Sequence, residues 1–241
     1  MFERLRYLLL QIRKANDPMR QQEVSCFARA LRCKRQQIAV TDMLSGPPSS
    51  AQLQRADVVL VGGSGDYSAT GEGAWLDRTL DLLRKIHAQS KPAFASCWGF
   101  QAMARALGGQ VIHDLPHAEL GTIELTLTDE GEQDPIFAPL GKTFYGQAGH
   151  EDHVIVLPPD ATLLASSPRV EHQAYRFEGK PIYCTQFHPE LSLTEMLSRL
   201  EAYPQYVERI AQVPFETFAV RCRETPETDL LLPRFIEHVF G

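Results

Sequence analysis

Residues 92–109 read PAFASCWGFQAMARALGG, and they pass from one kind of secondary structure into another. The first part, PAFASC, is a short apolar run typical of a buried strand. The second part, FQAMARALGG, has the pattern of a short helix that ends at Gly108 and Gly109. A strand that leads directly into a helix is the repeating unit of a parallel sheet covered by helices. This stretch therefore predicts an α/β fold.

The same alternation continues toward the N-terminus. The predicted strands there are RYLLLQI, QIAVTDM and DVVLVGG, and the predicted helical segments are Gln21 to Arg32, Ala51 to Arg55 and Trp75 to Ala88. Because strands and helices alternate, we expect an open, mainly parallel twisted sheet with helices on both faces.

The pattern changes between Val111 and Pro168. Segments such as GTIELTLT and HVIVLPP alternate with period two and are joined by Gly, Pro and Asp turns. We therefore expect a small antiparallel section, followed by a further buried strand in KPIYCTQFHPEL. Three helices are predicted at the end of the chain, over Ser192 to Ala202, Tyr206 to Gln212 and Asp229 to Phe240. The whole of residues 1–241 is interpreted as one domain with a helical extension from 192 to 241.

Composition excludes several classes of protein. The 241 residues are 44% hydrophobic and carry a formal charge of −6, which argues against a nucleic-acid surface. Five cysteines without C-x-x-C spacing favour a reducing, cytoplasmic compartment. The apolar run from Tyr7 to Leu10 is too short for a signal peptide or a membrane span, so no membrane is expected as a partner.

Cys97 lies at the predicted junction of strand and helix. In open α/β sheets the chemistry gathers at the carboxyl ends of strands. The small residues Ala95 and Gly99 suit a sharp turn that exposes a side chain, and the positive end of the following helix favours a thiolate. The alternative is that Cys97 is a small buried hydrophobe, which is the commoner fate of a free cysteine.

A histidine and a carboxylate follow each other in Gln186-Phe187-His188-Pro189-Glu190. Pro189 favours an extended backbone at His188, and residues two apart in an extended segment project to the same side. Glu190 can therefore orient the imidazole of His188, as in a nucleophile, base and carboxylate triad. The alternative is an ordinary polar turn, which is the better interpretation of this motif taken alone; its combination with Cys97 favours the triad.

In these motifs the sequence resembles the class I glutamine amidotransferases, most closely the glutaminase domain of GMP synthetase. The family pattern G-x-C-x-G-x-Q corresponds here to ASCWGFQ, residues 95–101, and Q-F-H-P-E is unchanged at 186–190. The segments ALGGQVIHDLPHAELGTIELTLTD and HEDHVIVLPPDATLLASS are also similar to family segments in the same order. The likeness covers about residues 57–191 and implies a flavodoxin-like sheet.

The resemblance implies a role for each matching residue. Cys97 would attack the side-chain amide of glutamine, His188 would transfer protons, and Glu190 would hold the tautomer of His188. The backbone N–H groups of Gly63 and Trp98 would form the oxyanion hole. Residues Gln101, Ala148 and Gly149 would contact the substrate.

Gly63 lies in LVGGSGDYS, where the family usually has S-G-G-P-G. The alternatives are a plain tight turn or a phosphate loop, and the latter would need a lysine that is absent. Two departures from the family pattern stand out, since Ala95 and Ser64 replace the usual glycine and proline. No cofactor and no metal are expected, and His150, His153 and His172 are interpreted as polar loop residues.

Three functions are compatible with these residues. The first is a glutaminase that releases ammonia for a separate synthetase subunit, since no acceptor or ATP-binding domain is recognisable in the sequence. The second is a γ-glutamyl hydrolase or peptidase acting on larger γ-glutamyl amides, for which the loop DYSATGEGAW would shape a wider entrance. The third is a non-catalytic regulatory relic of the triad, which the intact Cys97, His188 and Glu190 make the least favoured.

Overall fold

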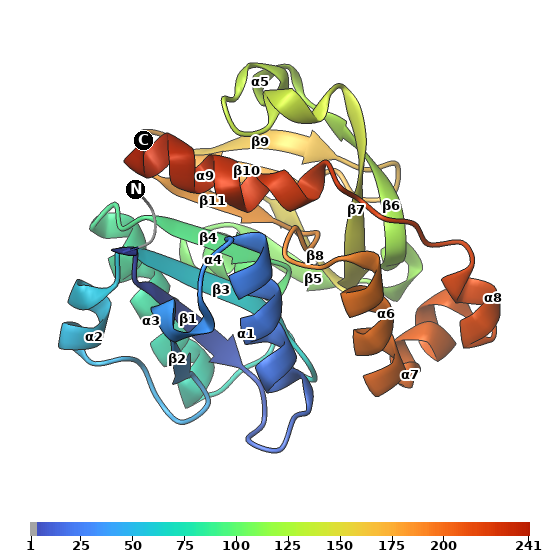
Figure 1. Cartoon of the computed structure of the whole chain (residues 1–241), viewed down its shortest axis with the longest axis horizontal. Helices are drawn as coiled ribbons and strands as arrows, with labels where there is room; N and C mark the ends of the chain where they lie inside the picture. Colours follow the sequence, from blue (N-terminus) through green and yellow to red (C-terminus); the bar gives the residue numbers. More distant parts are fainter. Residues whose placement is uncertain (1–3) are drawn as a thin grey trace.

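The computed structural model describes residues 4–241, and its centre is a nine-stranded sheet (Figure 1). The strand order is β2-β1-β3-β4-β11-β10-β9-β6-β7. The first five positions are the strands β2 (Ile38–Asp42), β1 (Tyr7–Ile12), β3 (Val58–Ser64), β4 (Ala93–Ser96) and β11 (Ile182–Thr185), which pair in parallel. The expected parallel sheet is therefore confirmed.

The antiparallel section is larger than one hairpin. It continues the same sheet through β10 (Ala174–Phe177), β9 (Ala161–Ser166), β6 (Glu119–Leu127) and β7 (Thr143–His150). A separate two-stranded ribbon pairs β5 (Gln110–His113) with β8 (Asp152–Val156). The expected antiparallel addition is thus confirmed, and it places β7 near the carboxyl ends of the parallel strands.

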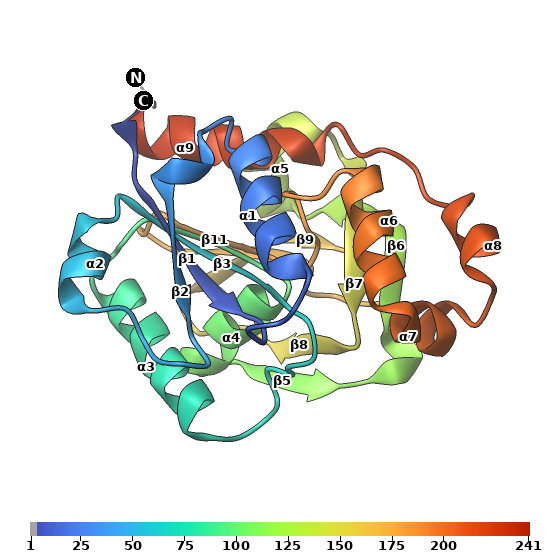
Figure 2. The same cartoon turned by 60° about the horizontal axis from the view of Figure 1, so that its bottom comes forward.

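Helices cover both faces of the parallel strands (Figure 2). One face carries α1 (Met19–Ala30) and α9 (Leu231–Phe240), and the other carries α3 (Ala74–Ala88) and α4 (Trp98–Ala106). Strand β1 shows the cause, because its alternate residues enter different cores: Tyr7 and Leu9 pack on the first face, Leu8 and Leu10 on the second. The short helices α2 (Ser50–Arg55) and α5 (Asp129–Gln133) complete this part of the fold.

The segment after β11 forms a third, smaller cluster beside β6 and β7 (Figures 1 and 2). It contains α6 (Leu193–Ala202), α7 (Pro204–Tyr206), a π-helical stretch Val207–Ala211 and α8 (Phe215–Ala219). Ser192 caps α6 by accepting a hydrogen bond from the N–H of Glu195, as a capping box does. A short 3₁₀ turn, Thr228–Leu230, then leads into α9, so the helix predicted from Asp229 starts two residues later.

Among residues 4–241 the structure contains no helix with the length and apolarity that a membrane crossing requires. The five cysteines are all unpaired. The division into a core of 57–191 and an extension of 192–241 stays a prediction.

Candidate active site

Cys97 connects β4 to α4 through a strained turn. Its backbone has φ 52° and ψ −105°, a region that L-residues adopt only when the surroundings impose it. The N–H of Cys97 donates to the carbonyl of Thr185 at 2.8 Å, and its carbonyl accepts from the N–H of Gln101 at 3.1 Å. The residue is 8% exposed. The turn therefore presents the thiol at the carboxyl edge of the sheet, in front of the helix N-terminus.

Gly99 allows α4 to approach the sheet at this turn. A Cβ built on Gly99 would lie 2.5 Å from the carbonyl oxygen of Val61 in β3. Ala95, which replaces the usual family glycine, causes no such conflict because its side chain packs in the core between the sheet and α3 and α4. The added methyl is therefore part of the core and does not obstruct the turn.

His188 and Glu190 follow strand β11, the parallel neighbour of β4. Thr185 pairs with Ser96, so the two chain segments leave the sheet side by side. The Nδ1 of His188 lies 2.6 Å from the Oε1 of Glu190, and both residues are buried. The backbone N–H of His188 donates to the carbonyl of Gln147 at 2.8 Å. This arrangement fixes the imidazole and leaves Nε2 for the thiol.

The electrostatics of this cluster favour a protonated imidazole. Burial alone lowers the pKa of His188, but the charges of Glu190 and Cys97 outweigh it and raise the pKa to about 9. For Glu190, burial alone would raise the pKa, but His188 and the nearby guanidinium of Arg199 outweigh it and hold the pKa of Glu190 below its ordinary value. The group therefore suits an imidazolium held between the carboxylate of Glu190 and the sulfur of Cys97.

Gly63 faces this cluster from β3. Between the paired positions Leu10–Val61 and Ile12–Ser64 the register shifts, so that Gly62 and Gly63 lie opposite a single residue of β1. Such a bulge turns the backbone out of the ladder, and bulges are common beside active sites. A Cβ on Gly63 would lie 3.0 Å from Cε1 of His188 and 3.9 Å from Cβ of Cys97.

Trp98 is the first residue of α4, where backbone N–H groups lack partners within the helix. The N–H groups of Gly63 and Trp98 thus belong to the two backbone segments that flank Cys97.

The three residues expected to contact substrate lie around the same thiol. The Nε2 of Gln101 already donates to the carbonyl of Asp152 at 2.7 Å and to Oε1 of Gln186 at 3.1 Å. The Sγ of Cys97 lies 3.7 Å from the carbonyl oxygen of Gly149. Ala148 and Gly149 belong to β7 and line a small cavity of about 40 Å³ that also touches Cys97 and His188.

A larger pocket of about 350 Å³ opens in front of Cys97. It is lined by Trp98, Gln101 and Gly149 on one side and by the loop from Ser64 to Ser68 on another. The C-terminal segment contributes Gln205, Tyr206 and Arg209, which sequence reasoning did not assign to the site. The sequence of this run, EAYPQYVERIAQVPFETFAVRC, is compatible with a lid, a dimer face or plain packing, and its apolar residues at helical spacing favour packing. The folded structure is needed to identify these three as pocket residues.

The interpretation of three histidines as polar loop residues is wrong for two of them. His150 ends β7 and His153 lies in β8, and both are buried. His150 contacts the carbonyl of Asp152 through Nδ1 and the carboxylate of Glu119 through Nε2. His172 does lie in a loop, but it is also buried, with Nδ1 2.9 Å from the carbonyl of Val154. The sequence did not indicate this burial, because a period-two pattern suggests that polar residues face solvent. A polar side chain can nevertheless be buried when it has a hydrogen-bond partner.

Among residues 4–241 no three His, Cys, Asp or Glu side chains come together in an arrangement that could hold a metal ion.

The chain is similar to proteins of known family and structure. Residues 23–202 match the family model of class-I glutamine amidotransferases. One subunit of the glutamine-hydrolysing GMP synthase of Methanothermobacter thermautotrophicus is 37% identical over 125 residues, which are 52% of this chain and 64% of that protein. Gamma-glutamyl peptidase 3 of Arabidopsis thaliana is 26% identical over 188 residues, 75% of this chain and 71% of the peptidase. The chain thus spans just under two thirds of the length of the first relative.

A crystal structure of a glutamine amidotransferase from Thermotoga maritima shares the fold over nearly the whole chain. Its TM-score is 0.77 at 20% identity, and the match covers 98% of this chain and 99% of that one. The similarity thus includes the C-terminal segment beyond the family match. The family model covers about three quarters of the chain, so this protein belongs to the class-I glutamine amidotransferase family.

Proposed function

We propose that this protein hydrolyses the γ-carboxamide of glutamine through a thioester on Cys97. The observation that carries the proposal is the buried cluster of Cys97, His188 and Glu190 at adjacent strand ends, with the imidazole held at 2.6 Å by the carboxylate. Cysteine, histidine and carboxylate in this order of contact are the parts of nucleophilic acyl transfer.

The first half of the reaction forms the thioester. The Cys97 thiolate attacks the amide carbon, and the tetrahedral oxyanion is stabilised by the N–H groups of Gly63 and Trp98. His188 then gives its Nε2 proton to the nitrogen, the C–N bond breaks, and ammonia leaves. Neutral His188 next removes a proton from water, which attacks the thioester and releases glutamate, regenerating the thiolate and the imidazolium.

The substrate would be held beside Cys97 by Gln101, Ala148 and Gly149. Because the Nε2 of Gln101 is already bonded within the protein, its carbonyl oxygen remains for the ligand. The main chain of β7 at Ala148 and Gly149 supplies further polar groups next to the thiol. This assignment predicts that Gln101→Ala raises KM more than it lowers kcat.

The ammonia released would serve a separate synthetase subunit. Support comes from the similarity to the Methanothermobacter protein, since the name of that relative describes one subunit of a glutamine-hydrolysing synthase. A synthetase that acts as partner should raise the glutaminase rate when the two proteins are mixed.

A second candidate is hydrolysis of larger γ-glutamyl amides or peptides. Two observations favour it. The pocket of about 350 Å³ in front of Cys97 falls in the range of small-molecule sites, about 300–1,000 Å³. The match to the Arabidopsis peptidase also covers more of this chain than the match to the Methanothermobacter protein does. The same triad would act, with an amino acid or peptide amine leaving in place of ammonia.

The deciding experiment measures amine release by the wild type and by Cys97→Ala, with free glutamine and with a panel of γ-glutamyl peptides. Cys33→Ala is the control, because Cys33 is only partly buried and lies outside the site. We expect activity in the wild type and the control and none in Cys97→Ala. A preference for free glutamine supports the first function, and a preference for the peptides supports the second.

A non-catalytic relic would behave differently. The wild type would release no amine from any of these substrates, and a glutamine-analogue electrophile would not label Cys97. Either activity or labelling that is lost in Cys97→Ala rules this alternative out.

A further inference from the structure

The glycine loop, residues 62–65, contains no proline that would restrict its backbone. It reads Gly62-Gly63-Ser64-Gly65, with serine where family members usually have proline. Proline fixes φ near −65°, whereas serine and glycine leave the backbone free. A backbone N–H at Gly63 stabilises an oxyanion only when it is held in place before the reaction. The first three of these residues end β3, where Ser64 pairs with Ile12, and the Ser64 hydroxyl donates to the carbonyl of Tyr67. Contacts from elsewhere in the chain add to this support, above all at Gly65, which lies beyond the strand.

The first contact comes from a buried ion pair behind Gly62. Glu23 of α1 is fully buried. Its carboxylate accepts hydrogen bonds from Nε of Arg13 at 3.2 Å and from Nε2 of Gln11 at 2.9 Å. A Cβ on Gly62 would overlap with Oε1 of Glu23. The loop thus lies directly against this carboxylate, with no room to move toward it.

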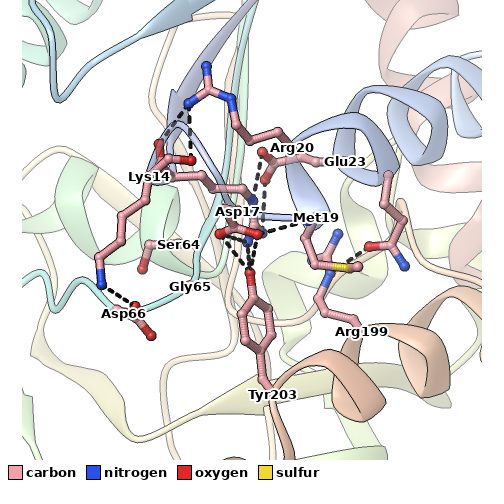
Figure 3. Close-up of polar contacts among 12 residues, drawn as sticks. Lys14, Asp17, Met19, Arg20, Glu23, Ser64, Gly65, Asp66, Arg199 and Tyr203 are labelled. Atoms are coloured by element: carbon pink, nitrogen blue, oxygen red, sulfur yellow. Dashed lines mark hydrogen bonds and ion pairs between the residues drawn. The ribbon is translucent and has the colours of Figure 1, made fainter.

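The second contact comes from the C-terminal segment (Figure 3). The hydroxyl of Tyr203 lies 2.7 Å from the carboxylate of Asp17 and accepts from Nη1 of Arg13 at 2.8 Å. A Cβ on Gly65 would lie 3.0 Å from this hydroxyl and 3.1 Å from Oδ2 of Asp17. Tyr203 therefore joins the buried Arg13 group to the far end of the loop.

The third contact lies one helical turn further on. The hydroxyl of Tyr206 donates to the carbonyl of Gly65 at 2.8 Å. Next to it, Lys14 pairs with Asp66 at 2.7 Å, but both side chains are about half exposed, so this pair contributes little. The loop is thus held from behind by Glu23 and at Gly65 by two tyrosines.

We propose that Tyr203 and Tyr206 are positioning residues that hold the glycine loop 62–65 in place of the missing proline, and so aim the N–H of Gly63 at the reacting carbon's oxygen. The inference rests on the proposed function, because it assumes that Cys97 acts by acyl transfer. Neither tyrosine is placed in the chemical step itself. Tyr206 lines the large pocket and Tyr203 does not, and both tyrosines line the small cavity beside Cys97 and His188.

The test compares Tyr203→Phe and Tyr206→Phe with the wild type. Each variant removes one hydroxyl and keeps the ring. Tyr145→Phe is the matched control, because the Tyr145 hydroxyl also contacts a carboxylate, Oε2 of Glu124 at 2.8 Å, on the exposed edge of β7. We expect kcat for hydrolysis to fall between about 10- and 100-fold in Tyr203→Phe, with KM within about twofold of wild type.

A second readout separates positioning from general disorder. Alkylation of Cys97 by iodoacetamide displaces iodide from carbon and forms no oxyanion, so its rate reports only the thiolate and its access. We expect this rate to be unchanged in Tyr203→Phe while kcat falls. Tyr145→Phe should match the wild type in both measurements.

Two results overturn the inference. Unchanged kcat in both tyrosine variants means that the loop is held without them, and equal losses of kcat and alkylation rate mean that the whole site has been disturbed. Failure of the proposed function is distinguishable, since the wild type itself would then hydrolyse neither glutamine nor γ-glutamyl peptides although Cys97 is alkylated; that result would overturn both proposals.

Discussion

Gly63 shows how little space a single residue has in this site. A Cβ at this position would lie 3.0 Å from Cε1 of His188, tighter than nine in ten real Cβ contacts, so the imidazole or the backbone at Gly63 must shift by a few tenths of an ångström. Alanine keeps the backbone N–H, but the shift moves this donor or the imidazole out of alignment, so we predict that Gly63→Ala lowers kcat by up to about 10²–10³-fold, the cost of losing an oxyanion donor. Amine release and thermal unfolding would be measured together.

The expected change in unfolding temperature for this variant is small, because the methyl meets the end of one side chain and no backbone atom beyond it. An active Gly63→Ala protein would contradict the placement of Gly63 opposite the imidazole.

The ionisation of His188 sets the expected pH dependence. Since its pKa is raised to about 9 by Glu190 and Cys97, the imidazolium needed to protonate the leaving amine persists to about pH 9. We predict that kcat/KM falls above about pH 9. In Glu190→Gln the negative charge is lost, so the pKa of His188 should fall and the alkaline limb should move to lower pH.

The same shift links folding to pH. The raised pKa stabilises the folded protein most fully below about pH 6.5, the ordinary pKa of histidine, and this contribution is lost as the pH rises through about 9.

The prediction for the reaction rate has its own contradicting outcome. A pH–rate profile with the same alkaline limb in wild type and Glu190→Gln would show that Glu190 does not act on His188.

Among the secondary-structure elements, the approach of α4 to β3 depends on Gly99. A Cβ there would lie 2.5 Å from the carbonyl oxygen of Val61, so Gly99→Ala must push the helix away from the sheet. We predict a loss of about 2 kcal/mol or more in the free energy of unfolding. The displaced helix N-terminus would also lower activity.

Urea denaturation measures this loss. Ala102→Gly in the same helix is the comparison, and it should cost only about 1 kcal/mol because it introduces no clash. Equal stability of Gly99→Ala and wild type would mean that α4 and β3 are not in close contact.

Across the molecule, the last helix stabilises a core that is far along the chain from it. Phe235 of α9 is fully buried, with its ring centroid 5.5 Å from that of Phe94 and 5.9 Å from that of Tyr183. These partners lie in β4 and β11, the strands that precede Cys97 and His188. We predict that Phe235→Ala lowers the free energy of unfolding by about 3–5 kcal/mol.

Because Phe235 lies outside both cavities at Cys97, KM of the folded fraction should stay near the wild-type value. Thermal unfolding and steady-state kinetics at low temperature would test this. A large change in KM without a change in stability would contradict the purely structural role of α9.

Local sequence patterns predicted much of the fold but few of the residues that line the pocket. Strand β1 and helix α3 were predicted to within about one residue, because continuous apolar runs and helical periods are local signals. Strand β10 was not predicted, because its four residues are too few to show a strand pattern by themselves. Its pairing with β9 and β11 is visible only in the sheet. The burial of His150 was missed for a similar reason, because its partner Glu119 lies on another strand.

The amino-acid sequence alone specifies the parallel strands, the turn at Cys97 and the pairing of His188 with Glu190, because each depends on residues that are near neighbours along the chain. The adjacency of β4 and β11, which brings the histidine to the cysteine, is visible only in the folded chain. The same is true of the contacts of Tyr203 and Tyr206 around the glycine loop and of the C-terminal segment that lines the pocket. These contacts join positions distant in the chain, and burial of one common core, which no local pattern encodes, brings them together.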